Sequence, residues 1–341
     1  MSKIRNPGST KKYTTIRDIA QKAGVSANSV SRALNDKDDI SEETKLRVRR
    51  IASELGYIRH AAASGLRSGG MRSIGIIVTH IDNIFFSRIL QGINDRVSEK
   101  EYTLLILDSN EDPETEARNL RILAAYRVSG ILFVPALDLQ NSIDYAAIQS
   151  PHIEIVRHMP NIKGGYYIAD SGKSGEIAAE YLIGKGRRKL AYLGFDKPVS
   201  CNRNRMDGFI SKAASENAAL AQDAVRSCEA STEAAFQAMK TWLLDGFNFN
   251  GLFVYNDAMA FGAIRALVDS GKNVPGDISV IGHDDIETAQ SFIPRLSTIH
   301  VPKYRLGYDS ASALLEQIEG KKSGVVSAHK IYEPRLVARE T

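Results

Sequence analysis

The sequence predicts two unlike parts: a small all-α head, followed by a larger α/β body of parallel strands with helices on both faces. Three observations lead to this expectation. The chain has 341 residues, enough for two or three domains, and 43% of them are hydrophobic, enough to bury real cores. Residues 15–35 have the pattern of two short helices joined by a tight turn. Beyond residue 73, apolar strand-like runs alternate with amphipathic helical runs, which is typical of parallel sheets.

The head begins with a helix expected over residues 16–23. Thr15 is placed to cap it, and Asp18 completes a capping box three residues later. Gly24 can end the helix in a left-handed conformation, and Ser26 can cap the next one. The second helix separates its side chains: Val30, Ala33 and Leu34 face the core, while Ala27, Asn28, Ser31 and Arg32 face outward. This is helix-turn-helix geometry suited to the major groove of DNA, although a helical hairpin in another small bundle has the same pattern.

Charge is unevenly distributed along the chain. Residues 1–72 hold 15 Lys/Arg and 7 Asp/Glu, a net charge of +8, whereas residues 73–341 hold 29 and 33, a net charge of −4. A basic head on a mildly acidic body fits a head that binds a polyanion, and the alternative is an ordinary solvated basic surface. Residues 41–55 are expected to form a third helix capped by Ser41, with Leu46 or Val48 in its buried stripe.

Several classes of protein are disfavoured by what the sequence lacks. Cys201 and Cys228 are the only cysteines, and the histidines have no metal-ligand spacing, so we expect no metal. Phosphate-binding glycine motifs and nucleophile elbows are absent, so we expect no cofactor and no enzyme. The polar N-terminus and the lack of an 18-residue apolar run predict a cytoplasmic protein with no membrane partner.

Residues 14–67 resemble the DNA-binding head of the lactose-repressor (LacI/GalR) family of bacterial transcription regulators. The matching stretches are TIRDIAQKAGVS, SVSRALN, ISEETKLRV and ELGYIRHAAASGLRSG. The resemblance implies that Ala27, Asn28 and Arg32 read bases. Their chemistry agrees, since Arg pairs with guanine, Asn pairs with adenine and Ala contacts a thymine methyl. Side chains suited to phosphate oxygens are Thr15, Ser26, Ser29, Ser31 and Asn35.

Residues 60–70 are small, polar and glycine-rich, and by composition alone they form a linker. The resemblance implies a hinge helix that orders on operator DNA, with Leu66 wedged into the minor groove and Arg67 beside a phosphate. Gly65 departs from the family's bulkier residue and costs about 1 kcal/mol in a helix. The expected organisation is a basic arm over 1–14, the head over 15–59, the hinge over 60–72, and an effector-binding and dimerisation domain over 73–341.

The body is too long for one open sheet, so two lobes with a cleft at the carboxyl ends of the strands are expected. The resemblance continues through IGIIVTHIDNIFF, VSGILFVPA, NDAMAFGAIRAL and VPGDISVIGHDD, and implies a fold like that of a sugar-binding periplasmic protein. The implied N-lobe is 73–165 with 302–326, and the C-lobe is 166–299 with 327–341. Strands are expected at 73–79, 102–108, 130–134, 153–157, 189–194, 251–255 and 278–282. Helices are expected at 85–100, 114–126, 174–185, 206–217, 232–245, 258–270 and 304–319, with lobe crossings near 160–172, 298–302 and 324–330.

Polar and aromatic side chains follow several of these strands, where the family binds its effector. The candidate effector-binding residues are Asn83, Phe85, Phe86, Asp170, Arg205, Asn256 and Asp284. Asp257 is expected to cap the helix that follows it. The site departs from the lactose and purine pockets of the family at Val199, Cys201, Ala230, His283 and Lys303, so the ligand stays unnamed.

The sequence therefore predicts a transcriptional repressor of sugar-utilisation genes. A homodimer formed along the ligand lobes would bind a palindromic operator and leave it when a small sugar or sugar derivative binds. No heptad tail follows residue 337, so no tetramer is expected. The alternative is a soluble sugar-binding protein or carbohydrate enzyme with an incidental helical head.

Overall fold

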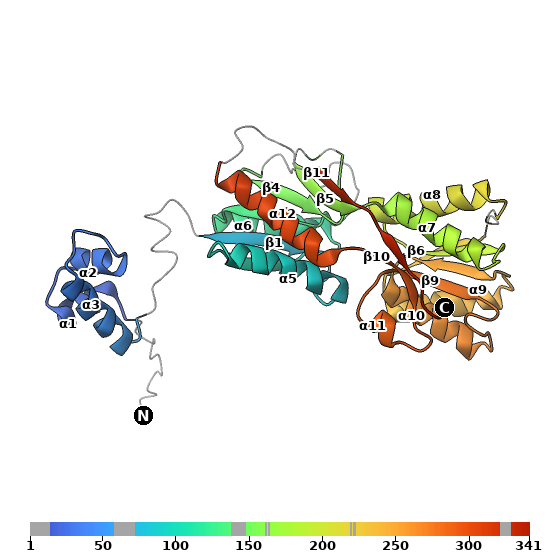
Figure 1. The fold of residues 1–341 in the computed structure, drawn as a ribbon, viewed down its shortest axis with the longest axis horizontal. Coiled ribbons are helices and arrows are strands. Elements are labelled where there is room, and N and C mark those ends of the chain that lie inside the picture. Colours follow the sequence, from blue (N-terminus) through green and yellow to red (C-terminus); the bar gives the residue numbers. More distant parts are fainter. Residues whose placement is uncertain are drawn as a thin grey trace, which may run out of the picture. The chain divides into compact units, whose positions relative to one another are not determined.

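The structure is a computed structural model that describes residues 14–57, 72–137, 148–160, 162, 164–218, 220, 223–320 and 329–341. The chain divides into two compact units, Met1–Gly69 and Gly70–Thr341 (Figure 1). Nearly all of the predicted basic arm, and the hinge residues Gly65, Leu66 and Arg67, lie outside the described residues. The predictions made for them remain predictions.

The head is a three-helix bundle of α1 (Ile16–Ala23), α2 (Ala27–Leu34) and α3 (Glu42–Glu54). Thr15 and Asp18 form the predicted capping box, in which the Thr15 amide donates to the Asp18 carboxylate at 2.7 Å. Gly24 ends α1 with φ 67°, and Ser26 caps α2. Of the two alternatives for α3, Val48 is buried and Leu46 is exposed.

The second unit contains two six-stranded sheets, each with helices on both faces (Figure 1). The N-lobe sheet has the order β11-β5-β4-β3-β1-β2, and the C-lobe sheet has the order β12-β10-β9-β8-β6-β7. The N-lobe strands are β1 (Ser73–Val78), β2 (Thr103–Asp108), β3 (Gly130–Phe133), β4 (His152–Ile155), β5 (Gly165–Ala169) and β11 (His329–Tyr332). The C-lobe strands are β6 (Leu190–Phe195), β7 (Val225–Cys228), β8 (Gly251–Val254), β9 (Ser279–Asp284), β10 (Ser297–His300) and β12 (Arg335–Val337).

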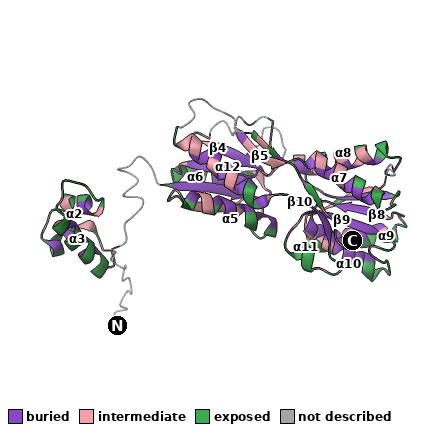
Figure 2. Cartoon of the chain, viewed as in Figure 1, coloured by how far each residue is buried: buried purple, intermediate pink, exposed green. Residues whose placement is uncertain are grey.

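All neighbouring strands are parallel except β12, which pairs antiparallel with β10. The N-lobe helices are α5 (Ile84–Ser98), α6 (Pro113–Ala125) and α12 (Lys303–Ile318). The C-lobe helices are α7 (Ser171–Gly184), α8 (Ser200–Ser215), α9 (Thr232–Leu244), α10 (Asp257–Asp269) and α11 (Thr288–Ser291). Figure 2 shows most of the strands buried, with exposed residues on the outer sides of the helices. None of the helices among the described residues is long and apolar enough to cross a membrane.

The first crossing follows Ala169, inside the predicted range 160–172, but the N-lobe ends later than the predicted 165; the third crossing lies outside its predicted range. β5 is hydrogen-bonded to β4, so the N-lobe continues to Ala169 instead of ending at 165. β11 pairs with β5, so the chain is still in the N-lobe sheet at Tyr332. The third crossing therefore lies between Tyr332 and Arg335, later than the predicted 324–330. β11 is an edge strand with the sequence HKIY, too short and too polar to give an apolar pattern.

The two helices beside the C-lobe sheet that matter most for the site are packed through glycines. A Cβ on Gly175 of α7 would lie 2.1 Å from the carbonyl oxygen of Arg205 on α8, and one on Gly208 would lie 2.1 Å from the oxygen of Gly172. The α8 helix begins at Ser200, six residues earlier than the predicted 206. Arg205 is thus held on a helix whose position is fixed by direct contact with α7.

Candidate nucleic-acid interface and ligand cavity

The outward face of α2 carries the predicted base-reading side chains. Ala27, Asn28 and Arg32 are all exposed. Asn28 and Arg32 are four residues apart, so they lie on one face of the helix. Arg32 is not isolated, because its guanidinium is paired with the carboxylate of Asp39.

The predicted phosphate-contacting residues differ in how far they are exposed to solvent. Thr15, Ser26 and Asn35 are exposed, and Ser29 is half-buried. Ser31 is only 9% exposed, which leaves little of its hydroxyl for a phosphate. Asn35 donates its side-chain amide to the Ser31 carbonyl at 2.7 Å, so it also closes the end of α2.

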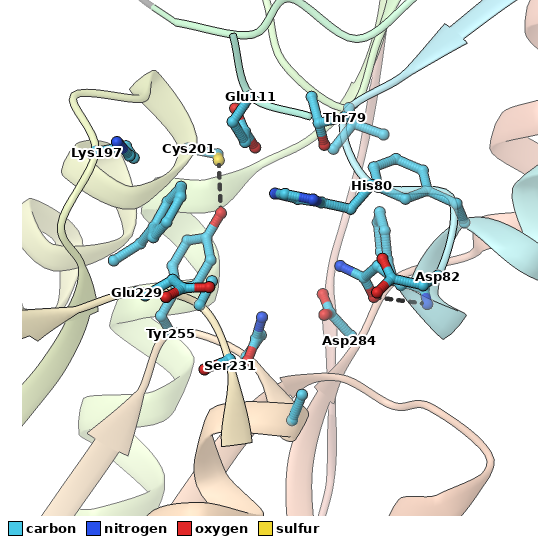
Figure 3. Close-up of a pocket in the computed structure, with 18 of the residues that line it drawn as sticks. Thr79, His80, Asp82, Glu111, Lys197, Cys201, Glu229, Ser231, Tyr255 and Asp284 are labelled. Carbon is cyan, nitrogen blue, oxygen red and sulfur yellow. Dashed lines mark hydrogen bonds between the residues drawn. The ribbon is translucent and has the colours of Figure 1, made fainter. Parts of the chain in front are cut away.

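The body contains a cavity of about 610 Å³ lined by residues of both lobes (Figure 3). Its walls are the segments that follow the carboxyl ends of the strands, as expected for parallel sheets. Six of the seven predicted effector residues line it: Asn83, Phe85, Phe86, Arg205, Asn256 and Asp284. The structure does not bring Asp170 to this cavity. Its carboxylate accepts from the Lys173 amide at 2.8 Å and caps α7.

Arg205 is buried in the wall of the cavity against Tyr255. Its guanidinium carbon lies 4.8 Å from the centre of the Tyr255 ring, and Nη1 donates to the Tyr255 carbonyl. The Tyr255 ring also stacks on Phe195, with centroids 5.5 Å apart. The buried Nε of Arg205 has no acceptor among the described residues. Buried cationic groups are normally paired, so this side chain is prepared for a partner that the protein does not supply.

A buried ion pair on the N-lobe side of the cavity was not predicted. Arg157 follows β4, and its Nη1 and Nη2 donate to the two carboxylate oxygens of Glu111 at 2.8 and 2.6 Å. Nη1 also donates to the carbonyls of Pro135 and Ala136. The signal that could have identified Arg157 is its position directly after a strand, the same signal that identified Asn256. Glu111 lies in the loop between β2 and α6, and no pattern in the sequence identified it as the partner of Arg157.

Asp284 ends β9 in a conformation unusual for a residue other than glycine, with φ 111°. Its carboxylate accepts from, or shares a proton with, Nδ1 of His283 at 2.8 Å. The Nζ of Lys303 donates to the backbone carbonyls of Asp284 and Asp285. Lys303, which stands where some members of the family have an aromatic residue, therefore ties the crossing into α12 to the strand end that carries Asp284 toward the cavity.

The ring of His283 lies behind the cavity. Its Nε2 is 3.2 Å from the hydroxyl oxygen of Ser174, which is 2.9 Å from the Asp170 carbonyl; the single hydroxyl proton can be donated to only one of these two at a time. Burial lowers the pKa of His283 to about 4, so the ring is neutral near pH 7. Ser174, His283 and Asp284 form a chain of contacts like that of a hydrolase, but Ser174 and His283 are buried and do not line the cavity.

The capping prediction for Asp257 is wrong. Asn256 caps α10, with its side-chain oxygen accepting from the Met259 amide at 2.8 Å. Asp257 is fully buried, and it accepts from the Thr298 hydroxyl at 2.6 Å and the Ile286 amide at 2.9 Å. Burial, and next the neighbouring Asp284, raise the pKa of Asp257 well above its ordinary value. Its role is to hold the loop after β9 in place.

Among the departures from the family, Cys201 and Ala230 line the cavity. The Cys201 Sγ is 3.4 Å from the Tyr255 hydroxyl (Figure 3). Val199 lies instead beside Arg157 and Met159, at the contact between the lobes. No group of three or more histidine, cysteine or acidic side chains that could hold a metal occurs within the described ranges.

Comparison with known proteins gives two family matches. Residues 15–60 match the model for bacterial regulatory proteins of the lacI family, and residues 179–341 match that for a periplasmic binding protein-like domain. The chain is 32% identical to the HTH-type transcriptional repressor PurR of Vibrio campbellii over 333 residues, covering 96% of this chain and 98% of that protein. It is likewise 32% identical to PurR of Haemophilus influenzae over 331 residues, with the same coverage.

Solved structures agree with these matches. The lac repressor dimer bound to operator and the anti-inducer ONPF has a TM-score of 0.87 at 27% identity, covering 97% of this chain and 99% of that one. A LacI family transcriptional regulator from Enterococcus faecium with bound ribose has a TM-score of 0.68 at 26% identity, covering 79% and 97%.

A helix-turn-helix head and a two-lobed body with a cavity between its sheets define a DNA-binding regulator with an effector-binding domain. The chain belongs to the lacI family of bacterial regulatory proteins. It is a transcriptional repressor of that family and not an enzyme, because the relatives and solved structures reported above are transcriptional regulators that cover nearly the whole chain. The alternative of a carbohydrate enzyme with an incidental head is thereby rejected.

Proposed function

We propose that this protein represses sugar-utilisation genes as a homodimer on a palindromic operator, and that a small sugar-like effector releases it. In this proposal Ala27, Asn28 and Arg32 read base edges in the major groove. Thr15, Ser26, Ser29 and Asn35 position the head on phosphates, with Ser31 contributing least because it is buried. A protein with this task works in the compartment that holds the DNA, the cytoplasm.

The main reason to favour a sugar is that the cavity presents both a hydrogen-bond donor and a hydrogen-bond acceptor to its ligand. Arg205 supplies a buried guanidinium with an unpartnered Nε, and Asp284 supplies a carboxylate. The other buried charges, Arg157 and Glu111, neutralise each other. A neutral ligand with several hydroxyl groups can donate to Asp284 and accept from Arg205 at the same time, which a sugar does.

The rim of the cavity supports a neutral ligand over an anionic one. Three exposed carboxylates, Asp82, Asp196 and Glu229, stand there against one exposed lysine, Lys197. A phosphate or carboxylate on the effector would be repelled by this arrangement. The related regulator whose structure contains ribose is a further reason to favour a sugar.

A purine is the rival effector, because the relatives of highest identity reported above are named PurR. A flat base is bound best between aromatic faces. Here Tyr255 packs against Phe195 and Arg205, Phe85 and Phe86 contact each other edge to face, and the small Ala230 stands at a position that the family fills with an aromatic residue. These contacts favour a polyol over a base.

The test is a thermal-shift panel on the full chain, with ribose and other pentoses and hexoses in one arm and hypoxanthine and guanine in the other. A stabilising sugar should also release the protein from its operator, and Asp284→Ala should abolish both effects while leaving operator binding intact. Stabilisation by a purine base and by no sugar would overturn the sugar assignment. An Asp284→Ala protein that responds normally would remove that residue from the site.

Exposed apolar side chains on the C-lobe support the homodimer. Ile293 is 88% exposed, and it adjoins Phe292, whose ring stacks on Phe261 at 4.5 Å. Adjoining apolar groups that are exposed on a surface can mark the place where another protein surface packs. A two-fold pair would also double the DNA contact area of a single head, which is too small for tight specific binding. Sedimentation that finds only monomer on a palindromic duplex would contradict the dimer.

A further inference from the structure

The predicted guanine-reading arginine of the head is bound side-on by a carboxylate of the same head. Nε of Arg32 donates to Oδ1 of Asp39 at 3.0 Å, and Nη2 lies 2.5 Å from Oδ2. Two parallel contacts of this kind fix the plane of the guanidinium as well as its position. The side chains are 44% and 53% exposed, so the pair lies on the surface of the head.

The loop after α2 is folded so that Asp39 must lie beside Arg32. Asp36 adopts φ 53°, which turns the chain back over the end of the helix. The amide of Lys37 then donates to the Arg32 carbonyl at 3.1 Å. Ile40 packs on the head core and Ser41 caps α3, so the far end of the loop is fixed too. The conformation of the loop therefore brings Asp39 close to Arg32.

The geometry leaves the reading edge of the arginine free. A guanidinium has five N–H groups, and the contacts with Asp39 use the edge formed by Nε and Nη2. The other edge, formed by Nη1 and the second hydrogen of Nη2, has the spacing that pairs with O6 and N7 of guanine. Arg32 can therefore contact Asp39 and a guanine at the same time.

We propose that Asp39 is a positioning residue that sets the specificity of Arg32 for guanine. The proposal rests on the base-reading role of Arg32 given above. Without Asp39, the arginine would sample many rotamers and could also meet a phosphate or another base. With Asp39, the orientation of the fork seen in the pair is favoured before DNA binds, so less side-chain entropy is lost on binding.

Asp39 should also lower the affinity of the head for DNA of any sequence. Its hydrogen bond with Arg32 lowers its pKa, so the carboxylate is ionised at neutral pH. An exposed ion pair contributes little by itself in water. A carboxylate at a DNA-facing surface repels phosphates, and this repulsion is the same for every sequence. Asp39 should therefore weaken binding to all DNA while strengthening the preference for guanine.

The head offers a matched control in the same loop. Asp36 pairs with Arg49 at 2.7 Å and with Lys45 at 3.4 Å, and its carboxylate is not paired with Arg32. Replacing Asp36 by asparagine removes the same charge from the same loop, and asparagine tolerates the left-handed conformation that the loop needs at this position. Arg32 therefore keeps its contact with Asp39 in this variant. Any change caused only by the lost negative charge should appear equally in both variants.

The experiment selects sequences from a library of duplexes with randomised palindromes, using the full chain and measuring enrichment by sequencing. Asp39→Ala should reduce the preference for guanine at one position in each half-site by about tenfold, within the range expected for one bidentate contact. Its affinity for a duplex of unrelated sequence should rise a few-fold. Asp36→Asn should show that rise but keep the preference. Asp39→Asn, which keeps one acceptor, should fall between Asp39→Ala and the unmodified protein.

Three results would contradict these claims, and they distinguish the positioning role of Asp39 from the base-reading role of Arg32. An unchanged preference in Asp39→Ala, with the preference lost in Arg32→Ala, would reject the positioning role and keep Arg32 as a base reader. A gain by Asp39→Ala that is larger on the guanine site than elsewhere would mean that Asp39 blocks Arg32 instead of positioning it. An unchanged preference in Arg32→Ala would reject the base-reading role itself.

Discussion

Replacing Gly175 by alanine tests the glycine contact that sets the position of Arg205. The added Cβ would lie 2.1 Å from the carbonyl oxygen of Arg205 and 2.6 Å from the amide nitrogen of Phe209. A carbon–oxygen contact needs about 3.3 Å, so α7 and α8 would have to separate by about 1 Å. Both obstacles are backbone atoms, so no side-chain rotation can relieve the overlap.

The magnitude follows from two opposing effects. Overpacking a well-packed interface costs about 3 kcal/mol when backbone has to move. Alanine is more favourable than glycine within a helix by about 1 kcal/mol. The net loss in the free energy of unfolding should be about 2 kcal/mol, and the displaced Arg205 should also weaken binding of the sugar found in the thermal-shift panel.

Gly184 provides the control, because it lies on the same helix with no atom within 4 Å of its added Cβ. Gly184→Ala should stabilise the protein by about 0.5–1 kcal/mol. Urea unfolding followed by the fluorescence of Trp242, the single tryptophan and fully buried in the C-lobe, measures both variants. A Gly175→Ala protein as stable as the unmodified one, with unaltered sugar affinity, would refute the reasoning.

Two further predictions concern the buried histidine and the hinge. Burial lowers the pKa of His283 to about 4, below its value of about 6.5 in the unfolded chain. Between these two pH values the unfolded state therefore binds more protons than the folded state. As a result, the free energy of unfolding decreases as the pH drops from 6.5 toward 4. His283→Asn should remove about 2 kcal/mol of the loss between pH 7 and pH 5, measured by urea unfolding, and an unchanged pH dependence would contradict the assignment. Leu66→Ala should weaken operator binding and reduce the bend of the duplex, as read from the mobility of circularly permuted fragments; an unaltered bend would exclude the wedge.

The head could be predicted closely because its signals are local. The capping box at Thr15 and Asp18, the turn at Gly24 and the cap at Ser26 are contacts between residues a few positions apart. Each is specified by neighbouring side chains and needs no tertiary information. The long central strands and helices of the body could be predicted for the same reason, since their apolar pattern extends over many residues.

The cavity could be predicted only in part. Asn256 lies just beyond the buried apolar strand β8 and Asp284 ends the buried strand β9, so their positions at the carboxyl edge of the sheet could be inferred from the sequence. The Arg157–Glu111 pair joins residues 46 positions apart, and nothing local to either marks the other. Asp170 also follows a strand and caps the next helix, as Asn256 does, but only Asn256 lines the cavity, and nothing local in the sequence separates the two.

The sequence by itself determined the class of fold and the helix ends of the head, because these depend on periodicity and on contacts within one turn. It also indicated four of the polar residues that line the cavity: Asn83, Arg205, Asn256 and Asp284. Only the tertiary structure decided which charges are neutralised. Arg157 is paired, Arg205 lacks a carboxylate partner among the described residues, and Arg32 is held by Asp39. Charge pairing depends on distances of a few ångströms between segments that only the folded chain brings together, and those distances determine what each arginine can still bind.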